Sequence, residues 1–104
     1  MKKVIDGKTY NTETACKLGA RDNGYRNHRD FNYCCETLYQ TKKGNYFIFG
    51  EGGAESKYKK QLSYNEWGAG EHIVPISIEE AKSWVKKHLN AEEYAKIFDE
   101  PEEA

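Results

Sequence analysis

Alternating apolar and polar positions in the middle of the chain predict a central β-hairpin. The first predicted strand, 31–41, has two faces: one carries Phe31, Tyr33, Cys35, Thr37 and Tyr39, and the other carries Asn32, Cys34, Glu36, Leu38 and Gln40. A turn at 42–45 leads into the almost entirely apolar run Tyr46–Phe49, which we expect to be a strand buried on both faces. This hairpin should form the heart of a small sheet.

The segments before this hairpin predict a second hairpin, a helix and a loop. Asp6-Gly7 lies between short β-forming segments in Val4–Tyr10, which is typical of a type I′ turn. A short helix is then expected, capped by Asn11 or Thr12 and ending near Gly19. Residues 21–30 have no periodicity and many turn-forming residues, which indicates an exposed loop.

The segments after the central hairpin are less regular. Three glycines within 50–53 are expected to end the strand, with a positive φ at Gly52 or Gly53. The pattern of 54–62 fits either a strand or a short helix, and 67–71 is predicted to be a loop. Pro75 should restrict a strand at 72–76 to the edge of the sheet, because proline cannot donate a ladder hydrogen bond.

Two amphipathic helices are predicted near the C-terminus. Ser77 and Glu80 match a capping box, and the apolar stripe that follows consists of Ala81, Trp84, Val85, His88 and Leu89. A second helix is expected after Asn90, with Tyr94, Ile97 and Phe98 on its apolar face. The predicted fold class is therefore α+β: a small antiparallel sheet built on a central hairpin and covered by C-terminal helices, with Trp84 and Leu89 packed on the sheet.

The length of the chain favours one domain, and its charges are distributed unevenly between the two halves of the sequence. A chain of 104 residues is expected to form a single domain, 1–104, with residues 99–104 as a frayed acidic tail. Residues 1–60 carry twelve Lys and Arg against seven Asp and Glu, whereas 61–104 carry four against ten. The two halves therefore differ in sign, which fits either attraction between them or a basic half that faces an anionic partner.

The sequence predicts a cytoplasmic protein with reduced thiols. The first residues become charged again after two apolar positions, which does not fit a signal peptide, and no apolar run is long enough to cross a membrane. Cys16, Cys34 and Cys35 are odd in number, and adjacent cysteines do not easily form a disulfide.

No motif predicts catalysis, a metal site or a cofactor. The three histidines and three cysteines lack the short spacing of metal ligands, and no Cys–His signature suggests a nucleophile. The glycines at 50–53 match neither phosphate-loop pattern, and the carboxylates lack a spacing that would mark an acid and a base. We therefore expect a binding protein without enzymatic activity.

Basic and aromatic residues are interleaved along the chain and form the candidate binding set. Its members are Arg21, Tyr25, Arg26, Arg29, Lys42, Lys43, Lys57, Tyr58, Lys59 and Lys60. Such a set fits phosphates and stacking bases, and it equally fits a protein interface rich in arginine and tyrosine. The third interpretation is an ordinary solvated sheet edge protected by lysines.

Several segments resemble one protein family. They are 5–15, 38–47, 50–58, 70–76 and 79–84. The similarity to which they belong extends over nearly the whole chain, and 21–30 matches least. The order of these motifs resembles small proteins carried by phages, plasmids and conjugative elements of Gram-positive bacteria, some of which are anti-CRISPR proteins. The resemblance implies an inhibitor in the bacterial cytoplasm that binds a CRISPR effector protein or ribonucleoprotein, such as Cas9. The alternatives are a nucleic-acid-binding accessory or regulatory protein of a mobile element, and a structural or dimer-forming protein.

Overall fold

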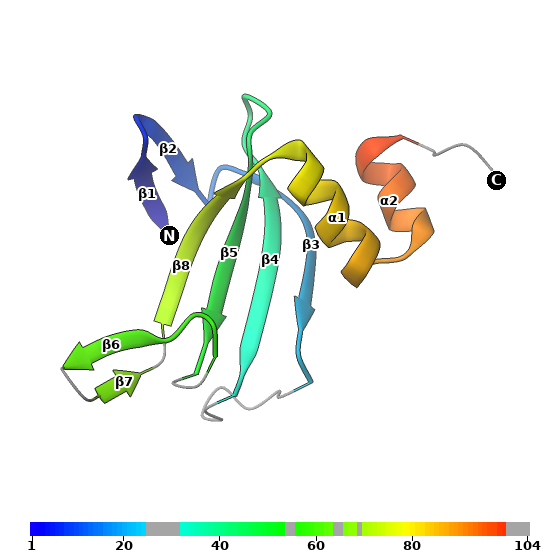
Figure 1. The fold of residues 1–104 in the computed structure, drawn as a ribbon. Helices are drawn as coiled ribbons and strands as arrows, with labels where there is room; N and C mark the ends of the chain where they lie inside the picture. The colour runs from blue at the N-terminus through cyan, green and yellow to red at the C-terminus, as the bar shows by residue number, and fades with distance from the viewer. Residues whose placement is uncertain (25–31, 54–55, 64–65, 69, 100–104) are drawn as a thin grey trace.

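The protein combines antiparallel sheets with two helices that follow them in the chain (Figure 1). The computed structural model describes residues 1–24, 32–53, 56–63, 66–68 and 70–99. The strands are β1 (Lys2–Ile5), β2 (Lys8–Asn11), β3 (Cys16–Asp22), β4 (Cys34–Gln40), β5 (Tyr46–Gly52), β6 (Lys60–Ser63), β7 (Glu66–Gly68) and β8 (Gly70–Ile76), and the helices are α1 (Ile78–His88) and α2 (Ala91–Phe98). The predicted α+β class is confirmed.

The main sheet has the strand order β3-β4-β5-β8, and all its pairs are antiparallel. The predicted central hairpin is β4–β5, in which Leu38 pairs with Ile48 and Gln40 pairs with Tyr46. β8 lies at an edge of this sheet, as predicted from the presence of Pro75. β1–β2 and β6–β7 form two separate two-stranded sheets.

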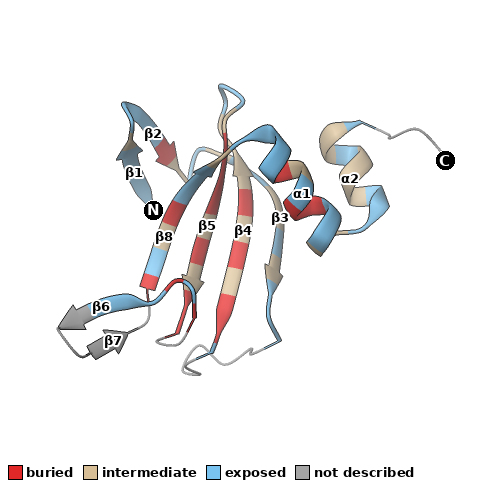
Figure 2. Ribbon diagram, in the orientation of Figure 1, coloured by how far each residue is buried: buried red, intermediate tan, exposed pale blue. Residues whose placement is uncertain are grey.

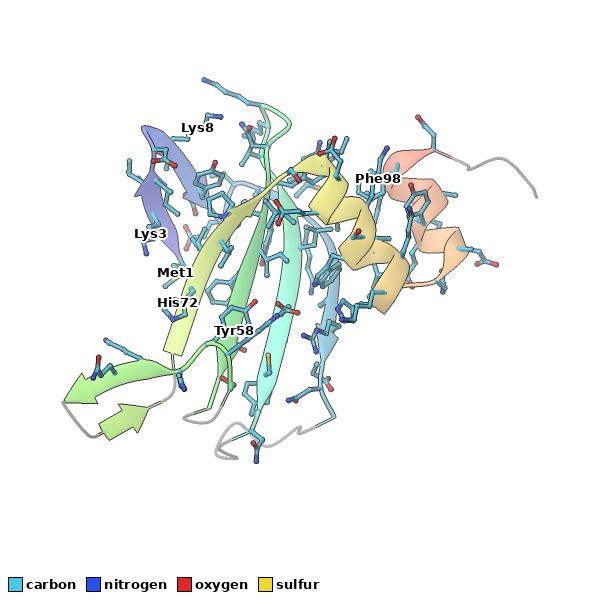
Figure 3. All side chains as sticks on the ribbon, viewed as in Figure 1. Met1, Lys3, Lys8, Tyr58, His72 and Phe98 are labelled. Atoms are coloured by element: carbon cyan, nitrogen blue, oxygen red, sulfur yellow. The ribbon has the colours of Figure 1, made fainter. Side chains whose placement is uncertain are left out.

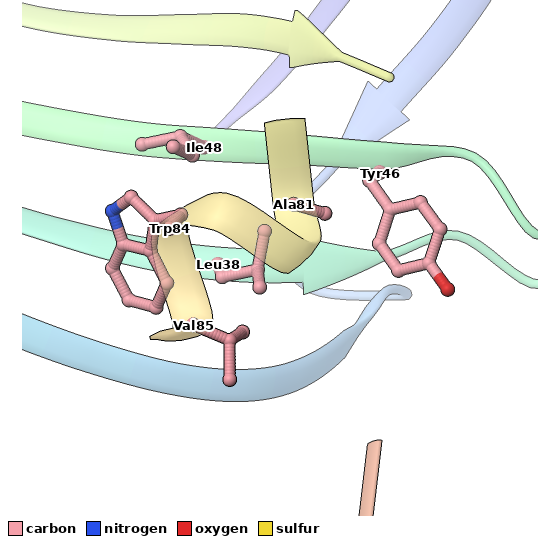
Figure 4. Packing of buried hydrophobic residues seen from close by; sticks show 6 residues of the cluster. All are labelled: Leu38, Tyr46, Ile48, Ala81, Trp84 and Val85. Carbon is pink, nitrogen blue, oxygen red and sulfur yellow. The ribbon is translucent and has the colours of Figure 1, made fainter. Parts of the chain in front are cut away.

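Helix α1 covers one face of the sheet and forms the main core with it (Figures 2 and 4). Leu38 and Ile48 of the sheet pack against Trp84 and Val85 of the helix, and Trp84 is only 7% exposed. The capping box is present: the Ser77 hydroxyl accepts a hydrogen bond from the backbone N–H of Glu80 at 3.1 Å. The predicted packing of this helix is confirmed.

Helix α2 lies beside α1 and completes the cover less tightly. Its side chains Tyr94, Ile97 and Phe98 are half-buried against the main core, and none of its residues is fully buried. Asn90 caps it by accepting from the backbone N–H of Glu93 at 2.9 Å, as predicted.

Neither α1 nor α2, the helices of the described residues, has the length and apolar character of a membrane span.

The β1–β2 hairpin covers part of the opposite face of the sheet. Asp6 and Gly7 both have positive φ, at 51° and 75°, which confirms the predicted type I′ turn. Tyr10 of this hairpin packs edge to face on Phe47, with ring centroids 5.4 Å apart, and both belong to a second core cluster with Ile73. The hairpin is therefore anchored by an aromatic contact.

The predicted helix before Gly19 is wrong, because Cys16–Asp22 forms the edge strand β3. The Asn11 side chain accepts a hydrogen bond from the backbone N–H of Glu13 at 2.9 Å, so it stabilises a turn instead of capping a helix. The chain then pairs with β4 along its length. Pairing with a distant strand overrides the weak local helix signal.

The glycine segment was also predicted wrongly, since β5 continues through Gly50 to Gly52. Neither Gly52 nor Gly53 has a positive φ. A Cβ at Gly50 would overlap the ring of Tyr58, and a Cβ at Gly52 would overlap the side chain of Ser56. These glycines allow the segment after β5 to fold closely over the strand, so they serve close approach and not a turn.

The structure also decides part of the segment left open at 54–62 and corrects the loop predicted at 67–71. The pattern of 54–62 fitted either a strand or a short helix, and residues 60–63 form strand β6. Residues 54 and 55 lie outside the described residues. The predicted loop 67–71 instead contains the end of β7 and the start of β8. Glycines at the strand ends made this region resemble a loop in sequence.

Replacing Gly50 with alanine should destabilise the fold by about 2 kcal/mol, because the new methyl group needs the space that the Tyr58 ring fills. Chemical denaturation would measure this loss. The Tyr58→Ala background provides the control, because the Gly50→Ala change should cost clearly less once the ring is gone. An equal cost in both backgrounds would contradict the proposed overlap.

Candidate functional site

The structure divides the candidate binding residues between the two ends of the sheet. Lys42 and Lys43 lie on the turn between β4 and β5, whereas residues 57–60 follow the other end of β5. Strands of seven residues separate these ends by roughly 20 Å. Three members of the set, Tyr25, Arg26 and Arg29, lie outside the described residues. The described members therefore do not form one continuous patch.

Arg21, Lys57 and Tyr58 converge on one buried carboxylate, Glu36, which is 2% exposed. Arg21 Nε donates to Glu36 Oε1 at 2.7 Å, and Lys57 Nζ lies 2.8 Å from Oε2. The Tyr58 hydroxyl also donates to Oε2, and Trp84 Nε1 donates to Oε1 at 3.4 Å. The network joins β3, β4, the segment after β5 and helix α1.

The charges of the Glu36 network are well defined. Burial by itself would raise the pKa of Glu36, but the hydrogen bonds from Lys57, Tyr58 and Arg21 lower this pKa to about 2. Burial and the Glu36 carboxylate raise the pKa of Tyr58. At neutral pH the carboxylate is therefore ionised and the phenol is protonated, so neither group is poised to exchange a proton.

Sequence reasoning missed Glu36 as the centre of this network. Its only signal is its position on the same strand face as Cys34 and Leu38, where a charged residue interrupts an otherwise apolar row. A buried carboxylate there needs cationic or donating partners. The sequence offers many lysines and arginines, and it does not show which of them fold over the strand.

The opposite face of the sheet carries a row of polar residues in register across four strands. The row is Asp22, Cys35, Glu51 and Glu71. The Tyr33 hydroxyl donates to Glu51 Oε1 at 3.0 Å, and a cavity of about 600 Å³ adjoins Glu51 and Glu71. Lys3 and Lys60 also line this cavity. Among the described residues, no group of His, Cys, Asp and Glu is arranged to hold a metal ion.

The thiols in the sheet are not activated. Burial raises the pKa of both Cys34 and Cys35. The carboxylates of Glu51 and Asp22 raise the pKa of Cys35 further, although the Tyr33 hydrogen bond opposes them. Because the thiolate is the nucleophile, neither residue is suited to attack a substrate.

We expect a thiol reagent to modify the native protein mainly at Cys16, the one exposed cysteine of the three. Cys34 and Cys35 should react at least about tenfold more slowly, because burial limits access and their raised pKa values reduce the thiolate fraction. Mass spectrometry of iodoacetamide-treated protein would measure the rates. Equal modification of all three sites without denaturant would contradict this description of the sheet.

A third polar region lies between the tips of two hairpins and is here called the hairpin-tip cleft. The cleft has a volume of about 430 Å³. Its lysines are Lys8 from β2 and Lys42 and Lys43 from the β4–β5 turn. Figure 3 labels Lys8 on the β1–β2 hairpin. Its Nζ donates to Asn45 Oδ1 at 3.5 Å, which links the two tips. Lys8 was not in the candidate set, because only the folded hairpin brings it to the other lysines.

No protein-family model, curated protein or solved structure matches the chain.

Proposed function

We propose that the protein is a non-catalytic inhibitor of the anti-CRISPR type, which acts in the bacterial cytoplasm by binding a CRISPR effector ribonucleoprotein. Cas9 is the first effector to test. The observation that carries the proposal is the gathering of Lys8, Lys42 and Lys43 at one exposed end of the sheet. The resemblance of the sequence motifs to mobile-element proteins supports the choice of target.

The cluster suits a partner that carries phosphate. Within the described part of the chain, both ion pairs are made by Glu36, so no carboxylate pairs with these three lysines. Exposed lysines bind nucleic-acid backbones by releasing counterions, and this binding requires no chemical step. An effector loaded with guide RNA presents both phosphate and protein surface.

The chemistry of the polar groups supports binding over catalysis. Glu36 stays ionised inside a network that satisfies it, and the pKa of the Cys35 thiol is raised. General bases and nucleophiles need pKa values shifted toward neutral pH, which is the opposite of both shifts. These residues therefore support a structural role for the polar groups of the sheet.

The main test is DNA cleavage by Cas9 in the presence of the purified protein, added either before or after the guide RNA. Inhibition should be dose-dependent and should reach completion at about one protein per effector. A pull-down with and without guide RNA would show whether the RNA is part of the bound surface. Absence of both binding and inhibition across effectors of Gram-positive hosts would reject the proposal.

A nucleic-acid-binding accessory protein is the second candidate, and the same three lysines favour it. It predicts binding of free RNA or DNA that weakens steeply with salt. Binding to a protein surface should depend less on salt and more on buried aromatic or arginine residues. A salt titration of both complexes therefore separates the two functions.

A further inference from the structure

We infer that the hairpin-tip cleft is a binding site for the phosphodiester backbone of RNA or DNA. The inference rests on the proposed function, in which the protein binds a partner and performs no chemical step. It adds the surface that contacts the partner and the chemical group that this surface recognises. It begins from how two hairpins that are distant in sequence meet. Tyr10 fixes the β1–β2 hairpin to Phe47 of β5, next to the β4–β5 turn.

The anchoring places the cleft between two well-formed turns. Asp6 and Gly7 form the type I′ turn on one side. On the other side, the Thr41 N–H donates to the Asn45 carbonyl at 2.8 Å, and the Asn45 N–H donates to the Thr41 hydroxyl at 3.1 Å. The backbone of both turns is therefore held in place, so ligand binding requires little ordering of the main chain.

The groups that line the cleft are those that recognise an oxyanion. The cleft is lined by three lysines, Lys8, Lys42 and Lys43, and by three threonines, Thr9, Thr14 and Thr41. Among the described residues no carboxylate lines the cleft, although Asp and Glu together outnumber Lys and Arg in the chain. Lysine is a common phosphate ligand, acting as a point charge with three donors. Because the three lysines line the same cleft, they produce a local positive field on a protein whose net charge is −1.

The lining also indicates which part of a nucleic acid is bound. A nucleobase is usually held by an aromatic platform or on a Watson–Crick edge. Of the lining residues that the structure describes, Tyr10 alone is aromatic, and it is 6% exposed and already packed against Phe47. Its ring is therefore not free for a base. The expected contact is with backbone phosphate and should not depend on base sequence.

The test is fluorescence anisotropy with a labelled 16-nucleotide RNA and the DNA of the same sequence, each titrated over a range of KCl concentrations. Inorganic phosphate serves as the competitor in a third arm. The triple variant Lys8→Gln, Lys42→Gln, Lys43→Gln removes the cleft charges. The matched control, Lys86→Gln, Lys87→Gln, Lys96→Gln, removes the same charge from exposed positions on α1 and α2.

The wild-type protein should bind both oligonucleotides with a dissociation constant of about 10⁻⁶ to 10⁻⁴ M near physiological salt. The cleft variant should lose at least about tenfold in affinity, and its salt slope should fall by about 2, or roughly 0.7 for each lost contact to a single strand. The control should bind within about twofold of the wild type. All three proteins should melt at similar temperatures, because the substituted side chains are exposed.

Several results would overturn the inference. They are an absence of oligonucleotide binding at low salt, equal losses in the cleft and control variants, and complete displacement by millimolar inorganic phosphate, which would identify a small-anion site. The Cas9 cleavage assay keeps the two proposals separate. Oligonucleotide binding by a protein that does not inhibit would leave the cleft standing and reject the inhibitor. Inhibition that survives in the cleft variant, together with unchanged oligonucleotide binding, would reject the cleft.

Discussion

Replacing Trp84 with alanine is expected to lower the free energy of unfolding by about 3–5 kcal/mol, the largest loss expected from a single substitution in this protein. Trp84 is 7% exposed and packs with Leu38, Ile48 and Val85 between the sheet and helix α1. Truncation would leave a large cavity in a small core. Urea denaturation followed by circular dichroism would measure the change.

Trp84→Phe is the informative control, because it keeps an aromatic ring and removes the indole donor. The indole N–H donates to Glu36 Oε1 at 3.4 Å, a long hydrogen bond that the other Glu36 contacts make less important. We therefore expect a loss of about 1–2 kcal/mol for this variant, well below that of alanine. A native-like melting temperature for Trp84→Ala would contradict the position of α1 on the sheet.

Replacing Glu36 with alanine is expected to cost about 3 kcal/mol. The substitution removes the shared acceptor of the Arg21 guanidinium, the Lys57 ammonium and the Tyr58 hydroxyl. The loss should lie near the lower end for a broken buried ion pair, because the Lys57 side chain is 58% exposed and can turn into water. Thermal and urea unfolding of the purified variant would measure it.

The pH dependence of stability provides a second readout for Glu36. Its pKa is about 2 in the folded protein, below the value of about 4.3 for an unfolded glutamate. The folded state therefore favours the ionised form, and its stabilising contribution is present above the unfolded pKa and lost as the pH falls toward 2. Glu36→Gln should have a flatter stability profile between about pH 5 and pH 2 than the wild type. Parallel profiles would show that Glu36 is not the group that titrates.

The features predicted correctly from sequence are those encoded by neighbouring residues. The period-two pattern of the central hairpin is visible along a single strand, and the capping box needs only Ser77 and Glu80. The Asp6-Gly7 turn is local as well. In each case the signal and the structure lie within a few residues of each other, so no knowledge of the fold was needed.

The features predicted wrongly depend on partners distant in the chain. Strand β3 forms because β4 is available to pair with it. The helix predicted there relied on the apolar positions Ala15 and Leu18, whose spacing cannot reveal that partner. Gly50 is required by the ring of Tyr58, which returns over the strand after a turn. Glycine content alone does not distinguish such close approach from a chain reversal.

Among the candidate binding residues, too, the features encoded locally were predicted and those that depend on distant partners were not. Lysines on the β4–β5 turn were identified because turn residues are exposed wherever the turn lies. The role of Arg21 could not be read from its neighbours, since its acceptor lies on another strand. Likewise, the part of Lys8 in the cleft depends on the packing of Tyr10 against Phe47.

The placement of α1 on the sheet also affects how the chain is made on the ribosome. Strands β3, β4 and β5 are consecutive in sequence and can pair soon after synthesis, whereas their cover, α1, begins only at Ile78. Until that helix emerges, Leu38 and Ile48 have no α1 residues to pack against. Partly synthesised chains that expose such surfaces are prone to aggregate. Premature termination before Ile78 would therefore release a sheet with an uncovered apolar face, a product for chaperones or proteases.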